Sequence, residues 1–182
     1  ENGTAINTPV AVINKVEKYR KQLTNNDVIE FTFRPVKGLT IKSQNALNVY
    51  QRHDYQFWPS SLPNRVEGEG SDAYRNEGDY ITLNTENTVA YSNKFARKHN
   101  FNALIGFSAQ KYNANNFSLK ADGLLTDDLK WNNMAGVTSK ENYTADSNSE
   151  QIVKESVFAR VNYSYDGRYH LTMTGRFDGS SN

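Results

Sequence analysis

Hydrophobic and polar residues alternate with a period of two along the last part of the chain. Between Ser156 and Ser181, two alternating runs flank the dipeptide Asp166-Gly167. Asp-Gly between alternating runs indicates a β-hairpin, because a type I′ turn needs positive φ at both central residues. The apolar positions are Val157, Ala159, Val161, Tyr163 and Tyr165, then Tyr169, Leu171, Met173, Gly175 and Phe177. The intervening positions are polar except Phe158, so the pattern predicts a hairpin with one apolar and one polar face.

The same alternation recurs twice earlier in the chain. Residues 28–34 and 39–50 alternate around a turn at 35–38, and residues 80–95 and 101–110 alternate around a turn at 96–100. Long polar segments separate these three strand pairs. Outer-membrane barrels place short turns on the periplasmic side and long loops outside, whereas a soluble sandwich has no reason to sort its loops by length.

The expected fold class is therefore all-β: an antiparallel transmembrane β-barrel segment of about six strands. Six strands are too few to close a barrel, and an open sheet edge is not tolerated in lipid, so we expect a larger barrel around this chain. The predicted organisation is an external loop or strand end at 1–26, a hairpin at 27–50, an external loop at 51–79, a hairpin at 80–110, an external loop at 111–151 and a hairpin at 152–182.

Composition is consistent with a barrel wall. The mean hydropathy of −0.77 is very polar for a compact globule, but a barrel needs an apolar residue only at every second strand position. No window approaches 18 consecutive apolar residues, which excludes a transmembrane helix. The net charge of +1 gives no argument for nucleic acid, and the lack of cysteine excludes disulfides and thiolate metal sites.

Aromatic residues gather on the apolar faces close to the short turns. Rings with a polar tip suit the headgroup level, so we expect a lipid-facing girdle there, with ordinary cross-strand packing as the alternative. The residues of this predicted girdle are Phe31, Phe33, Tyr91, Phe95, Phe101, Tyr163, Tyr165 and Tyr169.

Three stretches resemble the SusC/RagA-type TonB-dependent transporters. The most specific are Arg160-Val161-Asn162-Tyr163 and, on the next strand, Arg176-Phe177-Asp178-Gly179-Ser180-Ser181. The stretches 99–108 and 36–40 are also similar to that family. The resemblance covers most of the chain in order and is weakest in the long polar segments.

The resemblance implies a barrel of about 22 strands, closed by an N-terminal plug, in the bacterial outer membrane. It implies import of glycan fragments or peptides under a SusD-like surface lipoprotein, with energy from TonB, ExbB and ExbD. No plug domain, TonB-contact segment or closing strands are present in this sequence. Transport is therefore expected of the protein to which these residues belong, with the remainder of its barrel, its plug and outer-membrane lipid as partners.

Several polar residues fall on the predicted lumen face. Buried charges need partners, so contacts to the plug or to a water-filled path are expected for them. These candidates are Lys42, Lys94, Arg160, Asn162, Arg176 and Asp178. The run at 178–181 could instead end a strand and order its backbone through local hydrogen bonds.

Aromatic residues in the long segments could stack on sugars, pack against a lipoprotein lid, or hold the loops to themselves. They are Tyr55, Phe57, Trp58, Trp131 and Tyr143. A soluble β-sandwich that binds carbohydrate through Trp58 and Trp131 is the alternative function.

Glu67, Glu69 and Asp72 form a weak calcium candidate, although their spacing does not match an EF-hand loop. No cofactor is expected. No nucleophile, Walker or dinucleotide motif occurs, and nothing holds two carboxylates at a fixed gap, so we expect no enzyme. An enzyme with acids in the long loops remains the third hypothesis.

Overall fold

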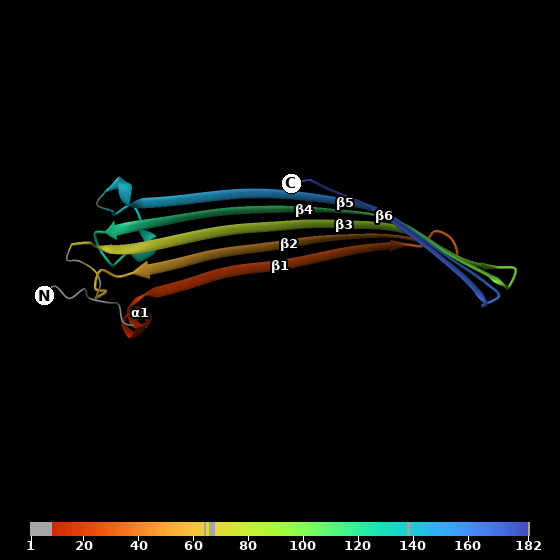
Figure 1. Ribbon diagram of the computed structural model, residues 1–182, viewed down its shortest axis with the longest axis horizontal. Coiled ribbons are helices and arrows are strands. Elements are labelled where there is room, and N and C mark those ends of the chain that lie inside the picture. Colours follow the sequence, from red (N-terminus) through yellow and green to blue (C-terminus); the bar gives the residue numbers. More distant parts are fainter. Residues whose placement is uncertain (1–8, 64, 66–67, 138, 182) are drawn as a thin grey trace. The chain divides into compact units, whose positions relative to one another are not determined.

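The described residues form one antiparallel sheet. The structure is a computed structural model that describes residues 9–63, 65, 68–137 and 139–181. The sheet has six strands in the order of the sequence, β1 to β6 (Figure 1). Their bounds are β1 Glu17–Phe33, β2 Leu39–Trp58, β3 Ser71–Phe95, β4 His99–Leu124, β5 Tyr143–Tyr165 and β6 Tyr169–Ser181. This arrangement confirms the all-β antiparallel fold class, and the described residues contain no second sheet of the kind that a sandwich requires.

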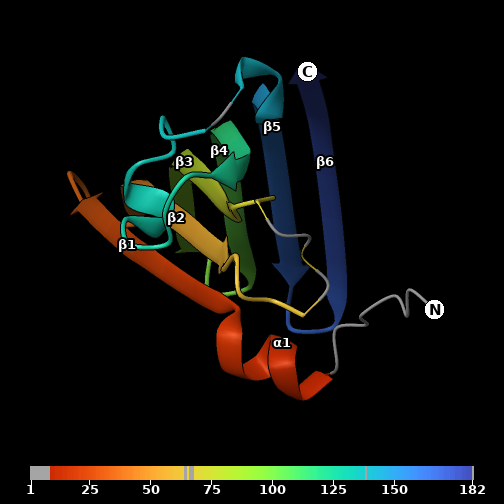
Figure 2. The same ribbon diagram turned by 90° about the vertical axis from the view of Figure 1, so that its left-hand side faces the viewer.

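Three short helices complete the described elements. Helix α1 spans Pro9–Lys15 and leads into β1 (Figure 2). The 3₁₀ helices η1, Lys130–Asn132, and η2, Lys140–Asn142, lie between β4 and β5. No helix in the described ranges is long and apolar enough to cross a membrane.

The strands are longer than their alternation predicts. β1 begins at Glu17 although the pattern suggests residue 28, and β4 continues to Leu124 although it suggests residue 110. The connections between paired strand ends are correspondingly shorter than the expected loops at 51–79 and 111–151. In the extension of β1 most side chains on both sides of the strand are polar, so the hydrogen-bonded ladder continues where the hydrophobic signal stops.

The turn of the last hairpin has the expected backbone. Asp166 and Gly167 have φ of 51° and 67°, and the Arg168 N–H donates to the Tyr165 carbonyl at 3.0 Å. The register pairs Tyr165 with Tyr169 and then Val161 with Met173 and Val157 with Phe177. Because directly opposed residues share a face, the apolar positions of both strands lie together on one side.

The chain divides into two units, each described separately. The turn unit comprises Thr24–Val49, Tyr80–Asn113 and Glu150–Asn182, and the loop unit comprises Glu1–Leu23, Tyr50–Asp79 and Ala114–Ser149. All buried hydrophobic residues of the described chain belong to the loop unit: Phe57, Leu62, Ala73, Ala114, Ala121, Leu124 and Met134. The turn unit buries no hydrophobic residue among those described, and its apolar side chains are half-buried or exposed.

Phe158, the aromatic exception on the polar face of β5, is accommodated by a glycine. A Cβ at Gly106 of β4 would come within 2.2 Å of the Phe158 ring, so only glycine leaves the ring room to lie over this backbone. The guanidinium of Arg176 lies 5.8 Å from the centre of the same ring. Phe158 is thus enclosed between a backbone and a cation, which explains an apolar residue at this position.

We expect Gly106→Ala to destabilise the full-length protein by about 1–3 kcal/mol, because the new methyl group displaces the Phe158 ring. Urea-induced unfolding in lipid vesicles measures this loss. Gly175→Ala is the matched control, since a Cβ there meets nothing within 4 Å. Phe158→Ala should remove most of the additional cost of Gly106→Ala, and equal costs in both backgrounds would contradict the contact.

Candidate functional site

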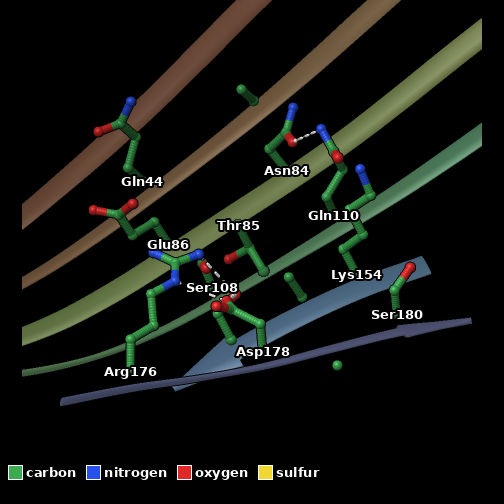
Figure 3. Close-up of a pocket in the computed structure, with 14 residues that line it drawn as sticks. Gln44, Asn84, Thr85, Glu86, Ser108, Gln110, Lys154, Arg176, Asp178 and Ser180 are labelled. Carbon is green, nitrogen blue, oxygen red and sulfur yellow. Dashed lines mark hydrogen bonds and ion pairs between the residues drawn. The ribbon is translucent and has the colours of Figure 1, made fainter. Parts of the chain in front are cut away.

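A polar groove of about 530 Å³ crosses β2 to β6 within the turn unit. Its polar side chains come from alternate positions of the strands, so they share one face of the sheet (Figure 3). They are Gln44, Asn84, Glu86, Ser108, Gln110, Lys154, Ser156, Arg176, Asp178 and Ser180. Ala46, two residues from Gln44 on the same face, has a short side chain that leaves the space open, and the lining also includes the small residues Thr85, Ala109 and Gly179.

Arg176, Asp178 and Ser156 form a hydrogen-bonded triad at one end of this groove. The Arg176 Nε donates to Asp178 Oδ1 at 2.7 Å, and its Nη2 donates to Ser156 Oγ at 2.9 Å. The Ser156 hydroxyl in turn donates to Asp178. Ser156 stands directly opposite Asp178 in the strand register, which is why these side chains meet. The triad fixes a guanidinium over Phe158 while more than half of its side chain stays exposed.

The remaining polar lining is hydrogen-bonded in part. Gln110 donates to the Asn84 carbonyl oxygen at 2.9 Å. Glu86 and Lys154 add one charge of each sign to the lining. Amides, hydroxyls and charges of both signs offer donors and acceptors to a polar solute, and no nucleophile–base pair is among them.

The predicted lumen residues lie on this polar face, but in separate places. Lys42 forms an ion pair with Glu30 at 2.8 Å. Arg160 and Asn162 line a second hollow of about 290 Å³, and Asn162 accepts a hydrogen bond from Thr172 at 3.0 Å. Lys94 lines a third hollow, of about 470 Å³. Only Arg176 and Asp178 lie in the polar groove.

Most of the groove residues carry no distinguishing signal in the sequence. Gln44, Ser108 and Gln110 occupy polar alternating positions, but such positions are common along any strand with a wet face. Asn84 and Glu86 lie at polar positions of the predicted strand 80–95, and nothing distinguishes them from its other polar residues. The strand register is what brings these residues together, and the register was not predictable between hairpins.

The aromatic residues of the loop unit mainly hold the loop unit together. Phe57 is only 2% exposed and belongs to a buried cluster with Ala73, Ala121, Leu124 and Met134, against which Trp131 and Tyr143 pack. The Tyr143 hydroxyl donates to the Met134 carbonyl at 2.7 Å. Phe57 is therefore a core residue, and its proposed contact with a ligand or lid is wrong because its ring is covered by protein.

Tyr55 and Trp131 are partly exposed and touch each other. Their ring centres lie 5.6 Å apart, and Tyr19 stacks on Tyr55 at 5.9 Å. Trp58 ends β2 and is half-buried. Trp131 also lines a hollow of about 280 Å³ with Arg75 and Phe117, so Tyr55, Trp58 and Trp131 keep the exposure that a binding role requires.

The weak calcium candidate has no support in the described residues. Glu67 lies outside them. The Asp72 carboxylate accepts hydrogen bonds from both terminal guanidinium nitrogens of Arg65 and from the Gly123 N–H. The hydrogen bond to Asp72 raises the pKa of Arg65 above its usual range, although burial opposes this shift. No group of three metal-ligating side chains occurs among the described residues.

The predicted girdle residues surround the short turns of the turn unit. Phe31, Phe33 and Tyr169 are at least 63% exposed. Tyr91 lies 6.5 Å from Phe101, ring centre to centre. Near the second and third turns, Phe95, Tyr163 and Tyr165 all contact the imidazole of His99. A lipid-facing role for these rings remains a prediction.

No family model matches the chain, but individual relatives do. It is 30% identical to TonB-dependent receptor P26 of Formosa agariphila over 183 residues, which is 98% of this chain and 18% of that protein. It is also 30% identical to receptor P3 of the same organism, over 99% of this chain and 18% of that protein. This chain is homologous to one segment of the TonB-dependent receptors. The resemblance stated from the sequence is thereby confirmed, and the chain spans about a fifth of the length of these receptors.

Solved structures show the same fold. A chain of the RagAB peptide importer in its closed-closed state matches with a TM-score of 0.84 at 19% identity, over 92% of this chain and 18% of that chain. The open-open state matches with a TM-score of 0.79 at 20% identity and the same coverage. The six-stranded sheet of this receptor segment therefore corresponds to a segment of that importer, and the alternative of a soluble sandwich is wrong.

In the loop unit, the carboxylate of Asp54 pairs with two arginines, Arg20 and Arg52. Asp54 is 9% exposed, accepts a hydrogen bond from Arg20 and lies 3.1 Å from the Arg52 Nε. Burial by itself would raise the pKa of Asp54, but the hydrogen bond from Arg20 and the charges of Arg52 and Arg20 lower it. The ionised carboxylate is therefore the form that stabilises the pairing of β1 with β2.

We expect Asp54→Asn to weaken this pairing modestly at neutral pH, because both guanidinium groups lose their counter-charge. The stabilisation by Asp54 is present above its unfolded pKa of about 4 and is lost as the pH falls through its lower folded value. Hydrogen exchange of β1 and β2 in the full-length receptor should therefore distinguish variant from wild type at neutral pH, and the difference should shrink progressively as the pH falls below about 4. Asp27→Asn is the control, since the Asp27 carboxylate accepts a hydrogen bond from Asn25 and forms no ion pair with any described residue; equal effects of the two variants would contradict the assignment.

Proposed function

We propose that the protein containing this chain is an active transporter of the bacterial outer membrane and that the chain forms part of its barrel wall. The distribution of apolar side chains carries this proposal. In the turn unit, Leu171, Met173 and Phe177 are 55%, 63% and 81% exposed, and no described hydrophobic residue of that unit is buried. A sheet face of this kind needs a second apolar phase, which lipid supplies.

The opposite face suits a water-filled interior. In the last hairpin it carries the pairs Ser156–Asp178, Arg160–Thr174 and Asn162–Thr172. Polar residues that point inward alternate with apolar residues that point to lipid in this class of barrel. The polar groove then faces the lumen, where its side chains contact the plug or the transported solute.

The relatives' names support the energy source and the kind of cargo. The curated relatives are TonB-dependent receptors, and the solved neighbour is a peptide importer of two named parts, RagAB. We therefore propose import of glycan fragments or peptides, energised through TonB, ExbB and ExbD, under a SusD-like surface lipoprotein. The relatives are named as receptors and a transporter, and the groove holds no reactive pair, so we propose no covalent chemistry.

Deleting the gene tests the transport proposal. The deletion strain should lose growth on oligosaccharides or on peptides as the only carbon source while retaining growth on the corresponding monomers. Uptake of a labelled oligomer by wild-type cells should stop on addition of a protonophore, because the energy comes from the inner membrane. Unchanged uptake of every oligomer tested, in the deletion strain or with the protonophore, would overturn the proposal.

The two faces of β6 predict opposite outcomes for the same substitution. Met173→Arg should reduce the free energy of folding into lipid vesicles by about 2–4 kcal/mol, because it places a charge in hydrocarbon. Thr174→Arg, one position along, faces water and should cost less than about 1 kcal/mol. Urea titration of the full-length protein in vesicles measures both values, and equal losses would show that neither face contacts lipid.

A further inference from the structure

The short turns of the turn unit carry an excess of positive charge. The turn segments 34–38, 94–99 and 166–168 contain Arg34, Lys37, Lys94, Arg97, Lys98 and Arg168 but a single carboxylate, Asp166. Asp166 lies 3.6 Å from Lys98 and 3.9 Å from Arg168, so one acid is shared by two cations. Arg97 has no ion pair within the part of the chain that the structure describes.

Two of these turns are joined into one body. The Asp166 N–H donates to the Lys98 carbonyl at 2.8 Å, which links the β5–β6 turn to the β3–β4 turn. The His99 ring stacks on Phe95 at 5.0 Å with nearly parallel planes, and its Nδ1 is hydrogen-bonded to the Tyr163 hydroxyl at 2.6 Å. These contacts hold together the backbone of residues 96–98 and 166–168, the joined turns, from which the cationic side chains project.

Exposed aromatic rings lie directly beside these cations. Phe95, Tyr165 and Tyr169 are 47%, 37% and 70% exposed. From the pair Tyr165–Tyr169 the apolar face continues along the hairpin through Tyr163–Leu171 and Val161–Met173. A ligand that satisfies both features has an anionic head next to hydrocarbon chains, which is the chemistry of a phospholipid and not of a soluble acidic protein.

We propose that the joined turns bind the phosphodiester headgroup of an anionic phospholipid through Arg97, Lys98 and Arg168, while its acyl chains lie on the adjacent aromatic and aliphatic residues. The planar guanidinium groups match the fork of phosphate oxygens, and the ammonium adds a point charge. The inference rests on the proposed function, because it needs this face of the sheet to contact a bilayer.

Native mass spectrometry of the full-length protein from nanodiscs of equal phosphatidylglycerol and phosphatidylcholine tests the site. The wild type should retain phosphatidylglycerol preferentially. The triple variant Arg97→Gln, Lys98→Gln, Arg168→Gln should lose this preference, by up to about fivefold for each charge removed. The matched control Lys18→Gln, Lys21→Gln, Lys111→Gln removes three charges elsewhere and should keep it.

Four further outcomes decide the matter. Equal retention of phosphatidylglycerol by the triple variant and the control would overturn the proposal, as would its complete displacement by excess inorganic phosphate, which would indicate a general anion site. If the triple variant does not fold, the wild type is measured at about 1 M salt instead. A preference for phosphatidylglycerol that high salt does not reduce would contradict an electrostatic site. Failure of the wild type to enter nanodiscs of phosphatidylcholine alone would instead overturn the barrel proposal and this inference with it.

Discussion

The whole structure depends on the requirement that a single sheet place side chains on both of its sides. Successive residues of a strand point in opposite directions, so one layer cannot hide an apolar face without a second layer or an apolar solvent. In the last hairpin, Val157, Val161 and Phe177 are all at least 36% exposed on the same side. The described residues supply no second layer, and the sheet is consistent with the wall of a barrel for that reason.

The same requirement explains how the polar face is built. Two of its cations are held by neighbours: Lys42 pairs with Glu30 on the adjacent strand, and Arg176 is held by Ser156 on the adjacent strand and by Asp178 two residues along. Partly exposed pairs of this kind contribute little to stability, so the triad serves to fix the position of the guanidinium more than to hold the sheet. The one large apolar group on this side, Phe158, is tolerated because Gly106 provides room and Arg176 covers the ring.

The sequence could predict the parts of the sheet whose two faces meet different environments. The alternation predicted the two faces of the last hairpin, and Asp166-Gly167 predicted its turn. In a barrel wall, lipid favours apolar residues on one face and water favours polar residues on the other. The first half of β1 could not be predicted, because a strand with water on both sides does not need to alternate apolar and polar residues. The polar groove was equally hidden: Ser156 and Glu86 are ordinary polar residues until the register places them beside Arg176 and Ser108.

In the loop unit, the same constraint on apolar side chains is met by covering them with protein. There Phe57, Leu124 and Met134 are at most 7% exposed, and Trp131 and Tyr143 pack against them. Where water replaces hydrocarbon, apolar side chains on a strand must be covered by protein, and the segment between β4 and β5 supplies that cover. Of the aromatic residues that the sequence offers as ligand contacts, Phe57 is buried by this packing, whereas Trp131 packs against the cluster and stays partly exposed. In the proposed barrel, the change from exposed to covered apolar residues along β2, β3 and β4 is what a strand that passes from hydrocarbon into water requires.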